Sequence, residues 1–257
     1  RAASRIADVS PVTVLRLLLE AGEKARDLHD SMMVNVKSRY IQCDEIWSFV
    51  QKKQKGVLPW DNQDFGDQYT FVAMDEETKL VPVYAVGKRN GETARSFMRD
   101  LAYRVTGRFQ LSTDSFRPYF DVVDTTFGVD IDYAMIHKKY GEEGKGEKRY
   151  SPGYIIGVEK MPMIGEPIKR KICTSHIERQ NLTMRMQMRR FTRLTNAFSK
   201  SLEHLKAAIA VHFFYYNFMR IHKTLRVTPA MEARLTRRLW TWQDLLTWET
   251  ISKREAA

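Results

Sequence analysis

The chain has 257 residues, of which 43% are hydrophobic and 28% are charged, and this suits one catalytic domain with appendages or two small domains. Its 42 Lys and Arg residues outnumber 31 Asp and Glu residues to give a net charge of +11, which favours a polyanionic partner such as nucleic acid. Two cysteines exclude a disulfide framework and a zinc site, and an apolar run too short for a bilayer excludes a membrane span, so we expect a soluble intracellular protein.

Residues 1–22 predict a helix, a tight turn at Val9-Ser10 and a second helix that opens on Pro11. Two short helices joined in this way predict a helix-turn-helix whose second helix would enter a major groove, although any helical hairpin fits so short a stretch equally well. Residues 23–38 are polar and predict a linker helix, so we assign residues 1–34 to a DNA-binding segment and linker. Because the chain begins with Arg1 rather than Met, we also expect a segment upstream of it.

The middle of the chain predicts a mixed α/β sheet of five strands flanked by helices. Runs rich in β-branched and aromatic residues predict strands at 40–50, 68–75, 80–86, 108–114 and 131–137, and helical spacing predicts helices at 90–105 and 117–127. The second and third strands are close enough in sequence to form a hairpin. In such a sheet the first and fourth strands are commonly neighbours.

Residues 138–171 are rich in Gly, Pro and Lys and predict an insertion, with a short hairpin around residues 155–160. This insertion either closes over DNA or is solvated charge, and the sequence does not separate the two. Two helices follow, from about Ser175 and about Ser201, and the tail carries two short helical signals. We therefore expect a catalytic domain over residues 35–200 and a helical region over residues 201–257.

Three acidic residues, Asp44, Asp114 and Glu178, are the candidate catalytic groups. Asp44 lies in the middle of the first strand, where a carboxylate is costly unless it binds a cation or does chemistry. Asp114 ends the fourth strand, at the sheet edge where α/β proteins place ligands, and Glu178 would project from a helix across that edge. Their oxygens would suit Mg²⁺ or Mn²⁺, and two such ions can activate the attacking oxygen and stabilise the leaving oxygen of a phosphodiester. Taken singly, each acid is as well explained as a cap, a turn former or a helix-dipole partner.

The segments "CDEIWSFV", "STDSFRPY" and "SHIERQNLTMRMQMRRFTRLTNAFSKS" together resemble the three catalytic blocks of DDE transposases of the insertion-sequence-one family. The third block is the most specific, and "YYNFMRIHKTLRVTPAMEA" resembles a segment found downstream of the last acid in many transposases and integrases. Block by block, the resemblance assigns Asp44, Asp114 and Glu178 as the catalytic and metal-binding acids of a ribonuclease H-like core. Members of the family often carry a zinc-binding segment before the helix-turn-helix, and nothing in this sequence forms one.

The basic residues after Glu178 are candidate DNA ligands. At 100° per residue, one helix face would carry Glu178 together with Arg185, Arg189 and Arg193. These arginines could bind the phosphates on either side of the scissile one. The candidate DNA-binding residues are Arg185, Arg189, Arg190 and Arg193. A solvated helix face is the alternative. His176 and Asn181 are accessory candidates, although each could instead cap or pack.

The resemblance implies a DNA transposase that cleaves one strand at a transposon end and transfers the freed 3′-hydroxyl to target DNA. It implies two ions of Mg²⁺ or Mn²⁺, transposon-end and target DNA as partners, a homodimer or higher oligomer on DNA, and a cytoplasmic, nucleoid-associated place in a bacterial cell. Two alternatives stay open: a domesticated, non-catalytic DNA-binding regulator, and a ribonuclease H-like structure-selective nuclease.

Overall fold

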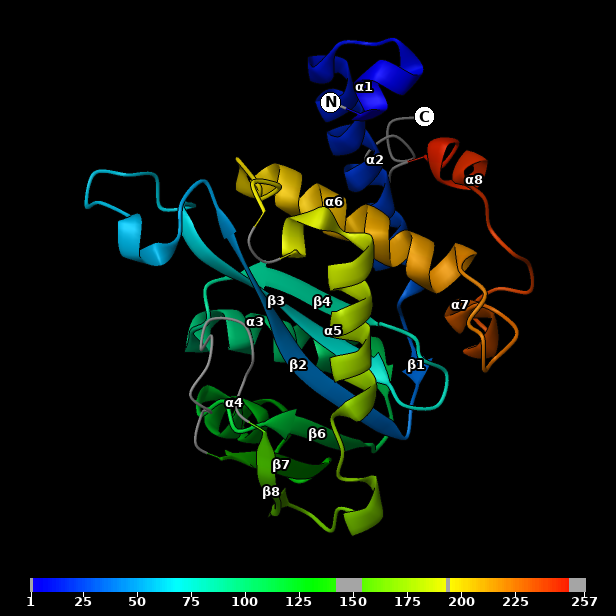
Figure 1. Ribbon diagram of the computed structural model, residues 1–257. Helices are drawn as coiled ribbons and strands as arrows, with labels where there is room; N and C mark the ends of the chain where they lie inside the picture. The colour runs from blue at the N-terminus through cyan, green and yellow to red at the C-terminus, as the bar shows by residue number, and fades with distance from the viewer. Residues whose placement is uncertain (1, 142–153, 193–194, 250–257) are drawn as a thin grey trace.

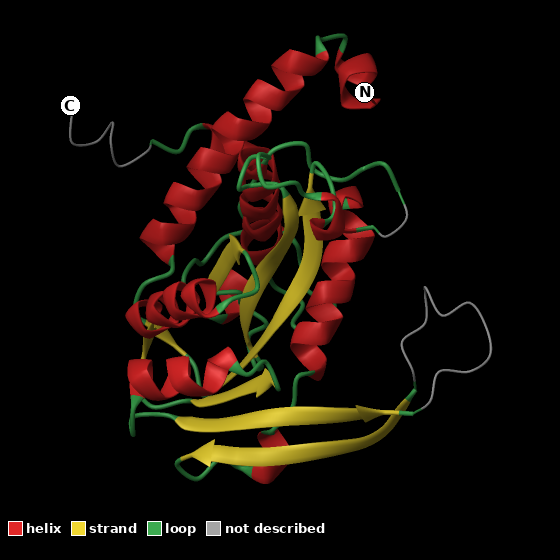
Figure 2. Ribbon diagram, turned by 90° about the vertical axis from the view of Figure 1, so that its left-hand side faces the viewer, coloured by secondary structure: helices red, strands yellow, loops and turns green. Residues whose placement is uncertain are grey.

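The structure is a computed structural model that describes residues 2–141, 154–192 and 195–249. Within these residues, a six-stranded mixed sheet with helices on both faces forms the centre of the protein (Figures 1 and 2). In order across the sheet the strands are β4 (Val83–Gly87), β3 (Gly66–Asp75), β2 (Tyr40–Val50), β6 (Gln110–Asp114), β7 (Asp132–Tyr140) and β8 (Ile155–Ile164). The predicted mixed α/β class is confirmed.

The predicted count of five strands is wrong, because β8 adds a sixth strand beside β7 in the described part of the chain. β8 lies in the predicted insertion, and it pairs antiparallel with β7 rather than forming a hairpin of its own. Residues 142–153 of that insertion lie outside the described residues. Gly157 and Pro162 interrupt the strand pattern of this run, and an edge strand tolerates proline because one side of its backbone needs no partner.

The connections of the sheet follow the predicted order. β3 runs antiparallel to both β2 and β4, and its pairing with β4 confirms the predicted hairpin of the second and third strands. β6 pairs parallel with β2, and β7 pairs parallel with β6, so the first and fourth predicted strands are neighbours as expected. A small two-stranded parallel pair, β1 (Val36–Lys37) and β5 (Val105–Thr106), lies apart from the main sheet.

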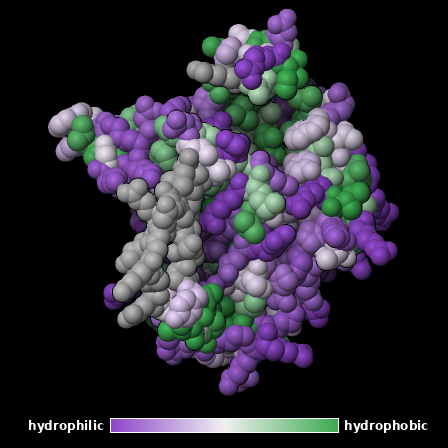
Figure 3. Space-filling view, viewed as in Figure 1, coloured by the Kyte–Doolittle hydropathy of each residue, from purple (hydrophilic) through white to green (hydrophobic). Residues whose placement is uncertain are grey.

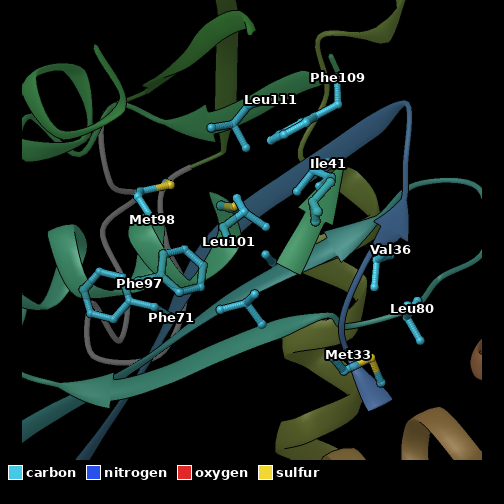
Figure 4. Close-up of a cluster of buried hydrophobic side chains, with 14 of the residues drawn as sticks. Met33, Val36, Ile41, Phe71, Leu80, Phe97, Met98, Leu101, Phe109 and Leu111 are labelled. Carbon is cyan, nitrogen blue, oxygen red and sulfur yellow. The ribbon is translucent and has the colours of Figure 1, made fainter. Parts of the chain in front are cut away.

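Helices cover the two faces of the sheet as separate layers (Figure 2). The helices are α1 (Ala2–Ala7), α2 (Pro11–Met32), α3 (Gly91–Arg104), α4 (Pro118–Phe127), α5 (Ser175–Gln187), α6 (Leu202–Phe214), α7 (Pro229–Glu232) and α8 (Trp242–Leu246). One buried cluster joins α3 and α4 to the sheet, and it includes Ile41, Phe71, Phe97 and Leu101 (Figure 4). A second cluster joins α5 and α6 to the opposite face. The alternating side chains of β2 therefore divide between two cores.

The predicted helix-turn-helix is not confirmed. Ser10 caps α2 by accepting a hydrogen bond from Thr13 N, and Pro11 opens the helix as expected. However, α2 continues through the expected linker to Met32 and packs against α6, where a Cβ on Gly22 would lie 2.4 Å from Ala207 Cβ. Figure 2 shows α1 and the start of α2 projecting beyond the sheet. No helix in the described ranges has the length and apolar character needed to cross a membrane.

Candidate active site

The register of two parallel strands brings Asp44 and Asp114 to the same level. Cys43 in β2 pairs with Thr113 in β6, so the next residue of each strand is one of the two aspartates. Both carboxylates line a cleft of about 630 Å³, and Glu178 on α5 lines it as well. The structure thus brings together the three acids that the sequence singled out, although they come from three distant parts of the chain.

Polar contacts between β2 and α5 hold the helix over the sheet. Gln42 Oε1 accepts hydrogen bonds from the backbone N–H groups of His176 (3.0 Å) and Ile177 (3.2 Å), and so satisfies two donors at the start of α5. One turn after Glu178, Asn181 Nδ2 donates to Asp44 Oδ2 at 2.9 Å. Because Gln42 and Asp44 lie on the same side of β2, these contacts fix the helix on both sides of Glu178.

Each of the three acids has defined partners in the cleft. Asp44 Oδ1 accepts from the backbone N–H of Glu45 at 2.8 Å, and Asp114 Oδ1 accepts from that of Phe116 at 3.0 Å. Glu178 Oε1 accepts from Thr174 Oγ1 at 2.5 Å and forms an ion pair with Lys138 of β7. The two aspartates are therefore oriented by backbone donors, whereas Glu178 is held by side chains that a ligand could displace.

Glu45 is a fourth acid of the cleft, and sequence reasoning missed it. One carboxylate oxygen each from Asp44, Glu45 and Asp114 lie within 4.8 Å of one another. Glu45 accepts from Arg89 Nε at 3.0 Å and from the Tyr119 hydroxyl. The adjacent acids in "CDE" were the available signal, but strand alternation places Glu45 on the α4 side of β2, opposite to Asp44.

Arg89 neutralises part of this charge. Its guanidinium bridges Glu45 and Asp114, with a distance of 3.4 Å between Arg89 Nη2 and Asp114 Oδ2. It also lies over the Phe116 ring, 4.0 Å from the centroid, which fixes its position next to the turn after β6. A single cation is thus shared by two carboxylates on one side of the cleft.

The pKa values of three carboxylates in the cleft are raised. Burial, followed by the charge of Asp114, raises the pKa of Asp44 to about 6 and that of Glu45 to about 7. Burial also raises the pKa of Asp114. A bound cation would stabilise the negative charges that crowd this partly desolvated cleft. The available ligands are carboxylate oxygens, which suit hard divalent cations.

These pKa shifts predict that the cation-free protein is destabilised by its own acids. The folded pKa of Asp44, about 6, exceeds its usual value of 3.8, so the neutral form stabilises the fold below about pH 4 and that stability is lost as pH rises through 6. The side chain of Asp44→Asn cannot ionise, so this variant should be more stable than the wild type at pH 8, by about 3 kcal/mol, with little difference near pH 4.

Urea unfolding in EDTA at both pH values measures this difference. Asp124→Asn, a change at an exposed position of α4, is the control and should alter stability equally at both pH values. If the difference in unfolding free energy between Asp44→Asn and the wild type is the same at both pH values, the pKa of Asp44 is not raised in the folded protein.

The predicted arginine face is only partly present. Arg185 lines the cleft, but α5 ends at Gln187, and Met188 is extended with φ −114° and ψ 104°. Arg189 and Arg190 therefore lie in a separate 3-10 turn and line a different groove, so the shared face predicted for Glu178 and Arg189 is wrong. Arg193 lies outside the described residues.

The two accessory candidates differ in their placement. Asn181 lines the cleft and contacts Asp44 directly, as described above. His176 is not among the residues that line it; its Nδ1 lies 3.2 Å from Lys79 Nζ, and burial followed by this ammonium lowers its pKa. Asn181 is therefore placed to orient an acid, and His176 packs beside the helix start.

Comparisons with known proteins agree with the predicted resemblance. Residues 160–222 match the family model described as IS1 transposase, which confirms the resemblance to DDE transposases of the insertion-sequence-one family and supports a DNA transposase. The matched segment contains Glu178, Asn181 and Arg185. A search of the curated proteins found no match.

Among solved structures, the chain is similar to one titled "Cryo-EM structure of piggyBac transposase synaptic complex with hairpin DNA". The identity is 11% and the TM-score is 0.35, over 87% of this chain and 55% of that chain. The chain thus spans about half the length of that transposase.

Proposed function

We propose that this chain is a DNA transposase that uses Mg²⁺ or Mn²⁺ to cleave one strand at a transposon end and to join that end to target DNA. The convergence of Asp44, Asp114 and Glu178 in one cleft is the observation that carries the proposal. Two bound cations would supply activation of the attacking oxygen and stabilisation of the leaving oxygen. The three acids would hold them, with Glu45 beside Asp44 and Asp114 as a further oxygen donor.

The sheet supports a ribonuclease H-like catalytic domain. Three consecutive antiparallel strands, β2, β3 and β4, are followed by β6 and β7, which pair in parallel on the other side of β2. Helices connect these last strands to the rest of the sheet. This order places the first two acids on the neighbouring strands β2 and β6, and α5, which carries the third acid, packs over β2 on one face of the sheet. Residues 35–200 would form this domain, residues 1–34 a DNA-binding segment and residues 201–257 a helical region.

In the first step, water would attack the phosphorus at the end of the element, and the bond to the 3′ oxygen would break to leave a 3′-hydroxyl and a 5′-phosphate. In the second step, that 3′-hydroxyl would attack a target phosphodiester, so one phosphodiester bond forms as another breaks. Arg185 is placed beside the acids to position a phosphate. Two ends must be processed together, which requires a homodimer or a larger assembly on bacterial DNA in the cytoplasm.

A strand-joining assay tests the proposal against its alternatives. The protein is incubated with a labelled duplex of the candidate end sequence, a target plasmid and Mg²⁺ or Mn²⁺, and joined products are scored. We expect joining only with a divalent cation, and a pre-cleaved end with a 3′-hydroxyl should join as well. Strand nicks without joining would indicate a structure-selective nuclease, and binding without either would indicate a regulator.

The ion pair of Lys138 with Glu178 predicts how the cleft responds to cations. The Lys138 ammonium occupies the position beside Glu178 Oε1 that a divalent cation would compete for. Lys138→Met should therefore tighten Mn²⁺ binding by about fivefold, the range expected for one partly exposed ion pair. Titration calorimetry measures the affinity. The control is Lys139→Met, since Lys139 pairs with Glu159 instead, and equal affinity in both variants would contradict the prediction.

A further inference from the structure

A second groove lies at the far end of α5 from the start that carries Glu178. It has a volume of about 610 Å³ and runs between α2, α6 and the turn that follows α5. Its apolar lining includes Leu18, Met188 and Trp242. Figure 3 shows hydrophobic side chains gathered in a recess beneath α1, over α2. The acids of the catalytic cleft do not reach this groove, so it is available for a separate role.

Two guanidinium groups border the groove. Arg189 is exposed, whereas Arg190 is half-buried and donates from Nη1 to Ser199 Oγ at 3.0 Å. Burial lowers the pKa of Arg190, because its charge in the groove wall is partly removed from water. A basic border around an apolar floor is complementary to a ligand that combines negative charge with a flat apolar surface.

A buried imidazole without a partner also lines the groove. His212 on α6 is 7% exposed, and its Nε2 has no hydrogen-bond partner among the described residues. Burial, followed by the charge of Arg220, lowers the pKa of His212 to about 4, so the ring is neutral at pH 7. Buried polar atoms are normally paired, so a ligand with a hydrogen-bonding edge would satisfy this nitrogen.

Two aromatic rings stack on each other at the groove. Tyr215 and Trp242 are parallel within 9°, with 6.2 Å between their ring centroids, and both line the groove. Tyr215 begins a π-helical turn (Tyr215–Met219) that continues α6, a local change of helix type that is common at functional sites. Trp242 is 47% exposed, which leaves part of its ring open to a ligand.

We propose that this groove binds an unpaired nucleotide of a DNA strand that extends from the catalytic cleft. The base would stack on the exposed part of Trp242, which Tyr215 supports from its other side, within reach of His212 Nε2, and the flanking phosphates would pair with Arg189 and Arg190. A nucleotide combines the flat ring, the hydrogen-bonding edge and the negative charge that these groups select, and an aliphatic helix lacks the first two.

One helix, α5, connects the cleft and the groove. The idea that the bound strand extends from the cleft rests on the proposed function. Arg185 lines the cleft and Gln187 lines the groove, two residues apart on α5. From Glu178 to Gln187 the helix rises ~14 Å, which is about four base steps of B-form DNA. Residues two apart point about 200° apart around a helix, so a strand held at the acids would pass the C-terminal end of α5 to enter the groove.

Binding to single-stranded DNA, measured in EDTA, tests this proposal without any chemistry. The probe is a fluorescent twelve-nucleotide oligothymidylate, and a blunt duplex of the same length is the comparison, with both affinities read by anisotropy. We expect Trp242→Ala to weaken single-strand binding about tenfold and to change duplex binding less than twofold. Arg189→Ala should weaken single-strand binding about fivefold and reduce the slope of log affinity against log salt concentration by about 1. Because Arg189 is exposed, this second variant keeps the test valid if Trp242→Ala folds poorly.

Two variants serve as matched controls, Trp60→Ala in the loop between β2 and β3, where Trp60 is 79% exposed, and Arg237→Ala at another exposed arginine. Groove variants that bind single strands as the controls do would overturn the proposal. So would an equal loss for single strands and duplex, or unchanged DNA binding with loss of self-association, which would assign the groove to a second copy of the chain. Failure of strand joining in the presence of cations would refute the proposed function and leave this result unaffected.

Discussion

Asp44→Asn is expected to reduce strand cleavage and joining at least about a thousandfold, or ~4 kcal/mol in activation free energy. Asp44 accepts from the backbone N–H of Glu45 and from the amide NH2 of Asn181. Asparagine keeps the first contact through its oxygen and keeps the second once Asn181 turns its amide, so the main loss is the charge that would hold a cation. Binding to end DNA, measured by anisotropy, should change less than about twofold.

Glu178→Gln should behave in the same way, because Glu178 is the third acid of the cleft. The control is Asp124→Asn, which removes an exposed carboxylate of α4 and should leave both activities unchanged. Cleavage at the wild-type rate in either Asp44→Asn or Glu178→Gln would refute the assignment of that acid.

Phe71→Ala is expected to lower the free energy of unfolding by about 3–5 kcal/mol, the range for a fully buried phenylalanine. The Phe71 ring packs against Phe97, Phe116 and Tyr119, at centroid distances of 5.8, 6.3 and 6.4 Å. Phe116 supports Arg89, and Tyr119 donates to Glu45, so the same ring stabilises the wall of the cleft. Urea unfolding measures the loss.

Phe120→Ala is the matched control on α4, where the ring is 41% exposed, and it should cost less than about 1 kcal/mol. A loss for Phe71→Ala no larger than that for Phe120→Ala would show that this core does not carry the stability assigned to it. In a variant of Phe71 that still folds, Mn²⁺ affinity should fall with stability, because the positions of Phe116 and Tyr119 depend on the same packing.

The main strands and the positions of two acids were predictable from local patterns. Runs with β-branched and aromatic residues mark β2, β3 and β6, and Asp114 lies where the last of these runs stops. The resemblance of its block to a transposase motif singled out Glu178, because its approach to the other acids depends on tertiary packing. The sixth strand escaped prediction, since β8 is an edge strand with Gly157 and Pro162 in its sequence and exposed residues on both faces. Pairing with β7 makes this segment a strand although its local sequence has only a weak preference for one.

The error over the arginines has a tertiary cause. Helical periodicity assumed that α5 continues beyond Gln187, but the chain turns there so that Phe191 can enter the core beneath α5 and α6. The turn is held by Arg190 on Ser199 and by Thr192 Oγ1, which donates to Arg185 O at 3.4 Å. The burial of Phe191 and the position of Ser199 depend on the tertiary fold, so periodicity alone could not place the helix end.

The charges that balance the acids were also beyond sequence reasoning. Arg89 follows β4 and Lys138 lies in β7, and neither belongs to a block that resembles a catalytic motif. They meet Glu45 in β2 and Glu178 on α5 only through the tertiary fold. The available signal was the excess of acids itself, since four carboxylates in one cleft require compensating cations.

Anomalous X-ray diffraction from crystals grown with Mn²⁺ would show directly whether the three acids hold cations, because it locates the ions without reference to activity. We expect two manganese peaks in the cleft, coordinated by carboxylate oxygens of Asp44, Asp114 and Glu178, and the loss of at least one peak in Asp44→Asn. A cleft without manganese, or ions bound only at sites away from these three acids, would contradict this expectation.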